Sequence, residues 1–105
     1  MQVKFYKSLW GMGGDLPAQL AKIKEAGYDG FEQWVVPHFT VRKACADAGV
    51  EYLGMCAGND PEQFKRDLGE LNDGGAVKVT VHCGGAHWTF EEGAKFFEAA
   101  MKITE

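Results

Sequence analysis

The chain has 105 residues, of which 46% are hydrophobic and 25% charged, and this composition is typical of one ordinary globular domain. Its formal net charge of −4 argues against a nucleic-acid-binding protein, because binding to phosphates requires a basic surface. No apolar run approaches the roughly 20 residues that a membrane-spanning helix needs.

The cysteines and the N-terminus bear on where the protein works. Cys45, Cys56 and Cys83 are odd in number and form no CxxC pair, and the first residues contain no signal-peptide pattern. We therefore expect reduced thiols and a cytoplasmic protein.

Four strand patterns alternate with four helical patterns, and we expect one domain over residues 1–105 without a linker. The strands are predicted at residues 2–9, 28–34, 50–56 and 76–83. Glycine precedes each of the last three, as helix C-termini favour, within Ala26-Gly27-Tyr28, Ala48-Gly49-Val50 and Gly74-Gly75-Ala76.

The helices between these strands have recognisable starts. The predicted N-caps are Asp15, Thr40, Asp60 and Thr89. Pro17 follows the first of them and Pro61 the third, and Glu92 completes a capping box with Thr89. In the fourth helix, the spacing predicts a buried face of Phe90, Ala94, Phe97 and Met101.

The alternation along the strands separates two faces of the sheet. In VKVTVHCGG, residues 77–85, valines alternate with Lys78, Thr80 and His82. In the third strand we assign Leu53 and Met55 to the apolar face, and Tyr52, Gly54 and Cys56 to the mixed one. An apolar face under helices and a mixed face inside a barrel favour an α/β (βα)₄ half-barrel with parallel strands. A flavodoxin-like open sheet remains the alternative.

Four stretches carry a family resemblance, namely KSLWG at 7–11, IKEAGYDGFE at 23–32, ACADAGVEYLGMCAGND at 44–60 and VKVTVHCGGAHWTFEEGAKFFEAA at 77–100. They resemble the first half of a xylose isomerase-like TIM barrel of the sugar phosphate isomerase/epimerase kind. The resemblance implies a sugar or sugar phosphate as substrate and a divalent metal, Mn, Mg, Co or Zn. In that family the metal ligands lie mainly on the last four strands, so one chain is expected to hold no metal site.

The resemblance also implies a substrate wall at the C-terminal strand ends. Glu32 and His82 are the candidate catalytic residues. The candidate substrate-binding residues are Trp10, Cys56, Asn59, His87 and Trp88.

Each of these candidates also has a structural alternative. Glu32 is an acid/base group or the ion-pair partner of Lys4 or Lys78, and His82 is a functional group or a hydrogen-bonded member of a polar layer. Trp88 stacks on a sugar or packs the barrel rim. Gly11-Met12-Gly13-Gly14 binds a phosphate or is a plain loop.

A lone half-barrel leaves two strand edges uncovered, so we expect a homodimer that closes an eight-stranded barrel. Two Glu32 and two His82 would then surround one mouth and offer a shared metal site. Three functions stay open: a self-assembling half-barrel without full catalytic machinery, a metal-dependent sugar isomerase or epimerase active as the dimer, and a flavodoxin-like binding module.

Overall fold

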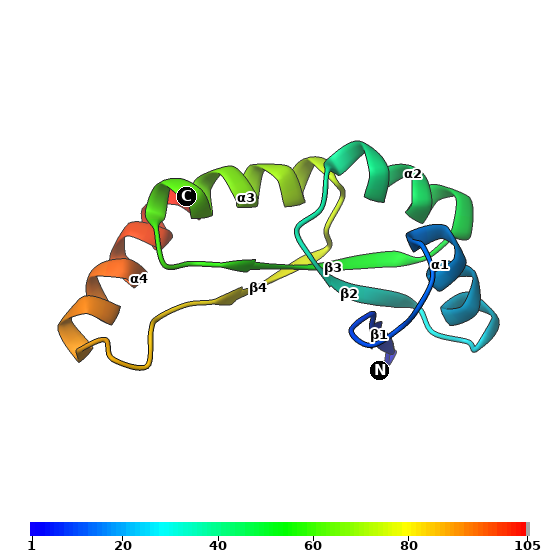
Figure 1. Ribbon diagram of the computed structural model, residues 1–105, viewed down its shortest axis with the longest axis horizontal. Helices are drawn as coiled ribbons and strands as arrows, with labels where there is room; N and C mark the ends of the chain where they lie inside the picture. The colour runs from blue at the N-terminus through cyan, green and yellow to red at the C-terminus, as the bar shows by residue number, and fades with distance from the viewer. Residues whose placement is uncertain (105) are drawn as a thin grey trace.

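The computed structural model describes residues 1–104 and alternates four strands with four helices (Figure 1). In chain order the elements are β1 (Tyr6–Ser8), α1 (Leu16–Glu25), β2 (Gly30–Trp34), α2 (His38–Ala48), β3 (Glu51–Ala57), α3 (Pro61–Asp73), β4 (Lys78–His82) and α4 (Phe90–Thr104). All neighbouring strands pair in parallel, which confirms the α/β class and the (βα)₄ repeat.

The strand order in the sheet is β1-β2-β3-β4, the same as the order in the chain. The helices also contact one another in sequence, α1 with α2, α2 with α3 and α3 with α4. A doubly wound sheet reverses its strand order at a switch point and places helices on both faces. Neither feature is present in residues 1–104, so the strand order contradicts a flavodoxin-like sheet and is consistent with a (βα)₄ half-barrel.

Three of the four predicted helix caps are confirmed. The side chains of Asp15 and Asp60 accept hydrogen bonds of 3.0 Å from the N–H groups of Ala18 and Glu62, and Thr89 accepts one of 3.2 Å from the N–H of Glu92. These side chains satisfy amide groups that have no partner within the helix. Each cap thereby fixes where its helix begins.

The Thr40 cap is wrong, because α2 already begins at His38, directly after Pro37. Its first N–H, that of His38, donates to Glu70 Oε1 of α3 at 2.6 Å. A side chain distant in sequence therefore replaces the expected local cap. The predicted glycine turns are confirmed, since Gly27, Gly49 and Gly75 adopt φ angles of 91°, 70° and 83°, which only glycine tolerates readily.

The first strand is shorter than predicted, at three residues instead of 2–9. Before it, Phe5 makes two 2.8 Å contacts with Asp29: its N–H donates to Asp29 Oδ2, and its carbonyl accepts from the Asp29 N–H. The other strands lie within about two residues of their predicted bounds.

The helix-covered face of the sheet holds the core. Phe31 of β2 and Tyr52 of β3 are fully buried, and their rings stack with centroids 5.1 Å apart. Gly54 leaves room for Leu71 of α3, which a Cβ at that position would strike. Tyr52, Gly54 and Cys56 therefore face the helices, and the sequence-based assignment of the third strand is reversed. Both sides of this strand carry apolar residues, so periodicity alone could not separate them.

The predicted buried face of α4 is also wrong. Phe96 is 5% exposed, and its ring centroid lies 6.0 Å from that of Phe64 and 6.1 Å from that of Trp88. Phe97 and Met101 are 57% and 66% exposed, and Phe90 projects into solvent. The helix turns its Phe96 side toward α3, which leaves an apolar stripe on its other side.

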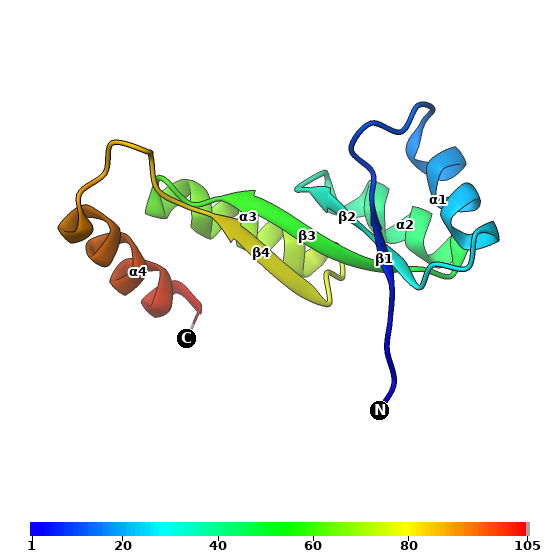
Figure 2. The ribbon, with the colours of Figure 1, turned by 90° about the horizontal axis from the view of Figure 1, so that it is seen from below.

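The molecule has a larger surface and a larger radius of gyration than is usual for a chain of its size. Its surface of 7027 Å² exceeds by about 1,200 Å² the roughly 5,800 Å² expected for a monomer of this mass. The Cα radius of gyration is 15.3 Å, whereas a chain of this length usually reaches about 13 Å. The uncovered sheet face and the extended N-terminal residues (Figure 2) both contribute to these differences. No helix within residues 1–104 is long and apolar enough to cross a membrane.

Candidate functional site

The sheet face opposite the helices, here called the open face, holds both candidate catalytic residues, Glu32 and His82. Figure 2 shows the strands in front of α2 and α3, as seen from this side. The pairing register and the alternation of side chains define its members. They are Tyr6 and Ser8 of β1, Glu32 and Trp34 of β2, Leu53 and Met55 of β3, and Lys78, Thr80 and His82 of β4.

Side chains from alternate strands meet on this face with a constant stagger. The rings of Trp34 and His82 lie 5.1 Å apart across β3, although the register places Trp34 level with Thr80, two residues before His82. Lys4 Nζ contacts Glu51 Oε1 at 2.7 Å, although Glu51 is level with Tyr6, two residues after Lys4. In both contacts, the residue on the later strand lies two positions beyond the register partner of the first residue. This is a shift of one residue per strand, in the same direction both times.

This stagger matches a known closed geometry. In an eight-stranded TIM barrel the shear is about eight residues, or one per strand, and alternate strands contribute side chains to the same interior layer. The open face is therefore layered as a barrel lumen is. Trp34 and His82 share the layer nearest the C-terminal strand ends, and Glu32 shares the next layer of the even-numbered strands with Thr80.

Glu32 is half-buried on this face, but its two expected partners do not pair with it. Lys4 binds Glu51 instead, and the hydrogen bond and charge of that carboxylate raise the pKa of Lys4. Lys78 makes no ion pair within residues 1–104. The Glu32 carboxylate therefore stays available on the open face, one layer below His82.

Cys56 does not belong to this site. Its side chain is fully buried on the helix side of β3, and burial raises the pKa of its thiol. Cys45 is similarly inert, because burial raises its pKa to about 11. Neither thiol meets the usual requirement for a reactive cysteine, which is an accessible thiolate.

The loops after β3 and β4 hold three more candidates. Asn59 Oδ1 accepts a 3.0 Å hydrogen bond from the N–H of Gly84 and so ties the two loops together. Trp88 is half-buried against Phe96, which supports its packing role. His87, in the same loop, is exposed.

The loop after β1 holds Trp10, which is exposed at the end of that strand. Gly11 and Gly14 follow it with left-handed φ angles of 82° and 94°. These angles describe a glycine-dependent loop ahead of α1, and the Trp10 ring beside it is exposed.

Trp34 is the site residue that sequence reasoning missed. It is 43% exposed at the end of β2, and its carbonyl accepts a 3.2 Å hydrogen bond from the Tyr52 hydroxyl. Trp34 lies two residues after Glu32, so the period-two alternation already placed it on the same face. The indole and the His82 ring form an aromatic patch at the C-terminal end of the open face.

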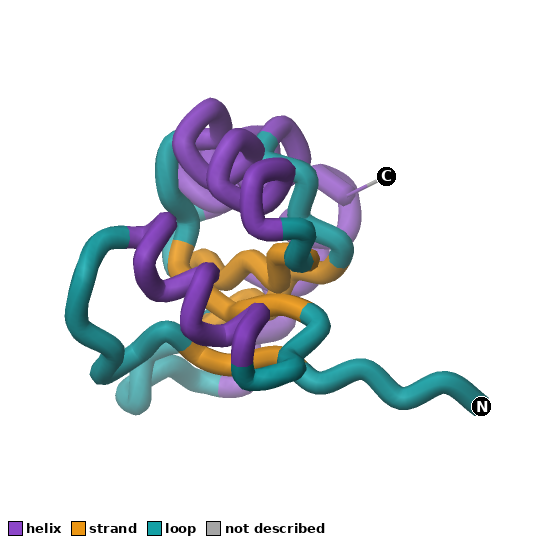
Figure 3. Tube along the Cα trace, turned by 90° about the vertical axis from the view of Figure 1, so that its right-hand side faces the viewer, coloured by secondary structure: helices purple, strands orange, loops and turns teal. Residues whose placement is uncertain are grey.

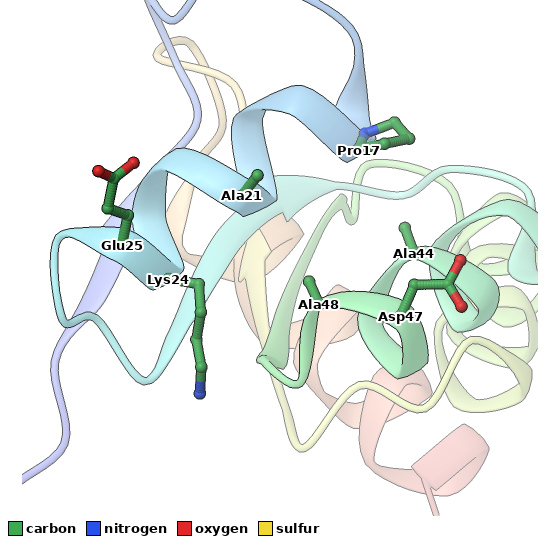
Figure 4. A pocket seen from close by; sticks show the side chains of 7 residues that line it. All are labelled: Pro17, Ala21, Lys24, Glu25, Ala44, Asp47 and Ala48. Carbon is green, nitrogen blue, oxygen red and sulfur yellow. The ribbon is translucent and has the colours of Figure 1, made fainter.

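A hollow away from this face lies between the outer sides of α1 and α2. It measures about 450 Å³ and is lined by Pro17, Ala21, Lys24, Glu25, Ala44, Asp47 and Ala48 (Figure 4). Lys24 in this hollow donates to the carbonyl of Gly49 at 3.2 Å. The hollow brings together no acid/base pair beside a nucleophile, so the open face remains the candidate site.

A metal site in one copy does not fit the residues present. Among residues 1–104, no three His, Cys, Asp or Glu side chains gather closely enough to hold an ion. The comparisons with models of protein families and with curated proteins found no match to this chain.

Proposed function

We propose that this chain is a half-barrel of the xylose isomerase-like sugar isomerase/epimerase type, and that it pairs with a second copy into a closed TIM-like (βα)₈ barrel. The observation that carries this proposal is the one-residue stagger per strand, seen in the Trp34–His82 and Lys4–Glu51 contacts. A sheet with this stagger closes on itself when eight strands are present.

The exposed apolar residues support pairing at both edges. Val3 and Phe5 precede β1 at one edge. At the other edge, Val77 precedes β4, and Phe97 and Met101 lie on α4. Burying these residues would remove both the free edges and the apolar stripe of α4 from water.

The open face supports sugar chemistry only in part. Glu32 and His82 could exchange protons with a carbon next to a carbonyl, and Trp34 with Trp10 offers aromatic surface to the apolar side of a sugar ring. Because residues 1–104 bring no three metal ligands together, no step is assigned to a metal. We therefore favour self-assembly without full catalytic machinery over a complete isomerase.

The first test is the solution mass of the 105-residue chain by light scattering. We expect about twice the chain mass of 11.5 kDa. The Phe97→Glu variant should dissociate, because its side chain is exposed in one copy and would be buried in the barrel. Phe39→Glu, on another exposed apolar residue, in α2, is the control and should stay dimeric. A monomeric wild type would overturn the homodimer.

The active-isomerase alternative is tested separately on that dimer. Aldoses, ketoses and their phosphates are assayed with and without Mn²⁺, and binding is followed by tryptophan fluorescence. Turnover that Glu32→Gln and His82→Ala both abolish would establish the alternative. Binding that Trp34→Ala weakens, without turnover, would support the non-catalytic form.

A further inference from the structure

We infer that Lys4 and Glu51 form the floor of the closed barrel, where two copies join their Lys4–Glu51 pairs into one ring of four alternating charges that sets how the copies pair. This inference rests on the proposed homodimer. It adds the register between the copies, the residues that select it and the end of the lumen that is sealed.

The ring follows from the stagger of alternate strands. Lys4, just before β1, meets Glu51 at the start of β3, at 2.7 Å. In a closed eight-stranded barrel, the next alternate strand after β3 is the first strand of the second copy. One residue of stagger per strand places Lys4 of that copy at the height of Glu51. Each carboxylate then lies between two ammonium groups.

The same stagger fixes the register across the joint. It aligns Val79 with Phe5 of the second copy, Thr80 with its Tyr6 and His82 with its Ser8. The alignment keeps the faces matched, since Thr80 and Tyr6 both lie on the open face while Val79 and Phe5 lie on the helix side. A slip of one residue would turn Phe5 into the lumen and Lys4 out of the ring.

The charges explain why the pair matters more to assembly than to one copy. In a single copy the Lys4 and Glu51 side chains are 41% and 34% exposed, and such partly solvated pairs contribute little to stability. Inside a closed barrel they would lose most of their water, so each charge would need its opposite. Replacing Glu51 by lysine would bring four positive charges together.

The floor lies opposite the candidate site. Glu51 begins β3, whereas Trp34 and His82 end β2 and β4. The Tyr6 hydroxyl, which belongs to the next layer, donates a 3.5 Å hydrogen bond to Glu51 Oε1. It adds a second layer of side chains to the floor. A ligand would therefore enter only at the C-terminal strand ends, where the candidate residues are.

Charge reversal tests the ring. Dimer dissociation constants are measured by sedimentation for the wild type, Glu51→Lys and the double swap Lys4→Glu/Glu51→Lys. Glu51→Lys should raise the dissociation constant at least tenfold, and the double swap should restore it to within about threefold. The control is Asp47→Lys, which breaks the exposed 2.9 Å Lys43–Asp47 pair on α2 and should leave the dimer unchanged.

The outcomes separate this inference from the proposed function. A dimeric wild type whose Glu51→Lys variant dimerises equally well would overturn the ring and leave the homodimer standing. A monomeric wild type would overturn both. Circular dichroism of each variant checks that the single copy stays folded, and a dissociated Glu51→Lys variant that the double swap does not rescue would also contradict the alternating ring.

Discussion

The two faces of the sheet differ in how well a single copy buries their side chains. On the helix-covered face, Phe31, Tyr52 and Cys56 are buried almost completely. On the open face, Trp34, Thr80 and His82 remain in contact with water. In Figure 3, helices lie above the strands of the sheet. Folding of one copy and closure of the barrel thus depend on different residues and can be disrupted separately.

The largest effect on a single copy should come from the helix-covered face. Phe31→Ala removes a fully buried ring that stacks on Tyr52, and we expect it to lower the free energy of unfolding by about 3–5 kcal/mol. Phe39→Ala, at an exposed position of α2, should change it by less than about 0.5 kcal/mol. Urea unfolding of both variants measures the difference, and similar losses would contradict the assignment of the core.

Two glycine variants should show how much stability is lost when a side chain is added on each face of the sheet. Gly54→Ala would press on the Leu71 side chain beneath the helices and should cost about 1–3 kcal/mol. Gly30→Ala would strike the Glu51 backbone carbonyl and come within 2.8 Å of the Tyr6 ring. Because a paired strand yields less than a side chain, Gly30→Ala should cost more. Thermal or urea unfolding that ranks them in the opposite order would contradict this packing.

A smaller effect should follow pH at the α2–α3 contact. Hydrogen bonds from the backbone N–H and the ring of His38 lower the pKa of the Glu70 carboxyl. A depressed pKa stabilises the fold above the unfolded value of about 4.3, and this contribution disappears as pH falls through the folded pKa. The stability difference between wild type and Glu70→Gln should therefore be present at pH 6 and shrink toward pH 3.

Urea unfolding at several pH values measures this difference. Glu25→Gln, on the exposed surface of α1, serves as the control and should show no such trend. A difference that stays constant from pH 6 to pH 3 would show that Glu70 acts through its shape alone.

The repeat pattern of the fold was predictable because its signals are local. Asp15, Asp60 and Thr89 cap helices from within their own first turn, and Gly27, Gly49 and Gly75 mark turns that need a left-handed backbone. The failures involve contacts distant in sequence. The start of α2 is capped by Glu70, 30 residues beyond Thr40 in the chain. The face that α4 buries depends on its contact with α3.

The site was predictable only where one side of a strand was polar. Lys78, Thr80 and His82 marked the open face of β4 correctly. Cys56 was misplaced because its strand is apolar on both sides, so only packing against Leu71 revealed its direction. The Lys4–Glu51 contact needed the stagger between strands, which no single segment contains.

The sequential strand order has a consequence for folding. Each pairing joins neighbouring βα units, with registers such as Tyr6 to Gly30, Gly30 to Glu51 and Leu53 to Lys78. Structure can therefore grow unit by unit, as in repeat proteins, with modest loop-closure costs at each step. A closed dimer would add a later step of a different kind. Refolding should then show a fast phase independent of protein concentration, followed by a slower one that accelerates as the chain becomes more concentrated.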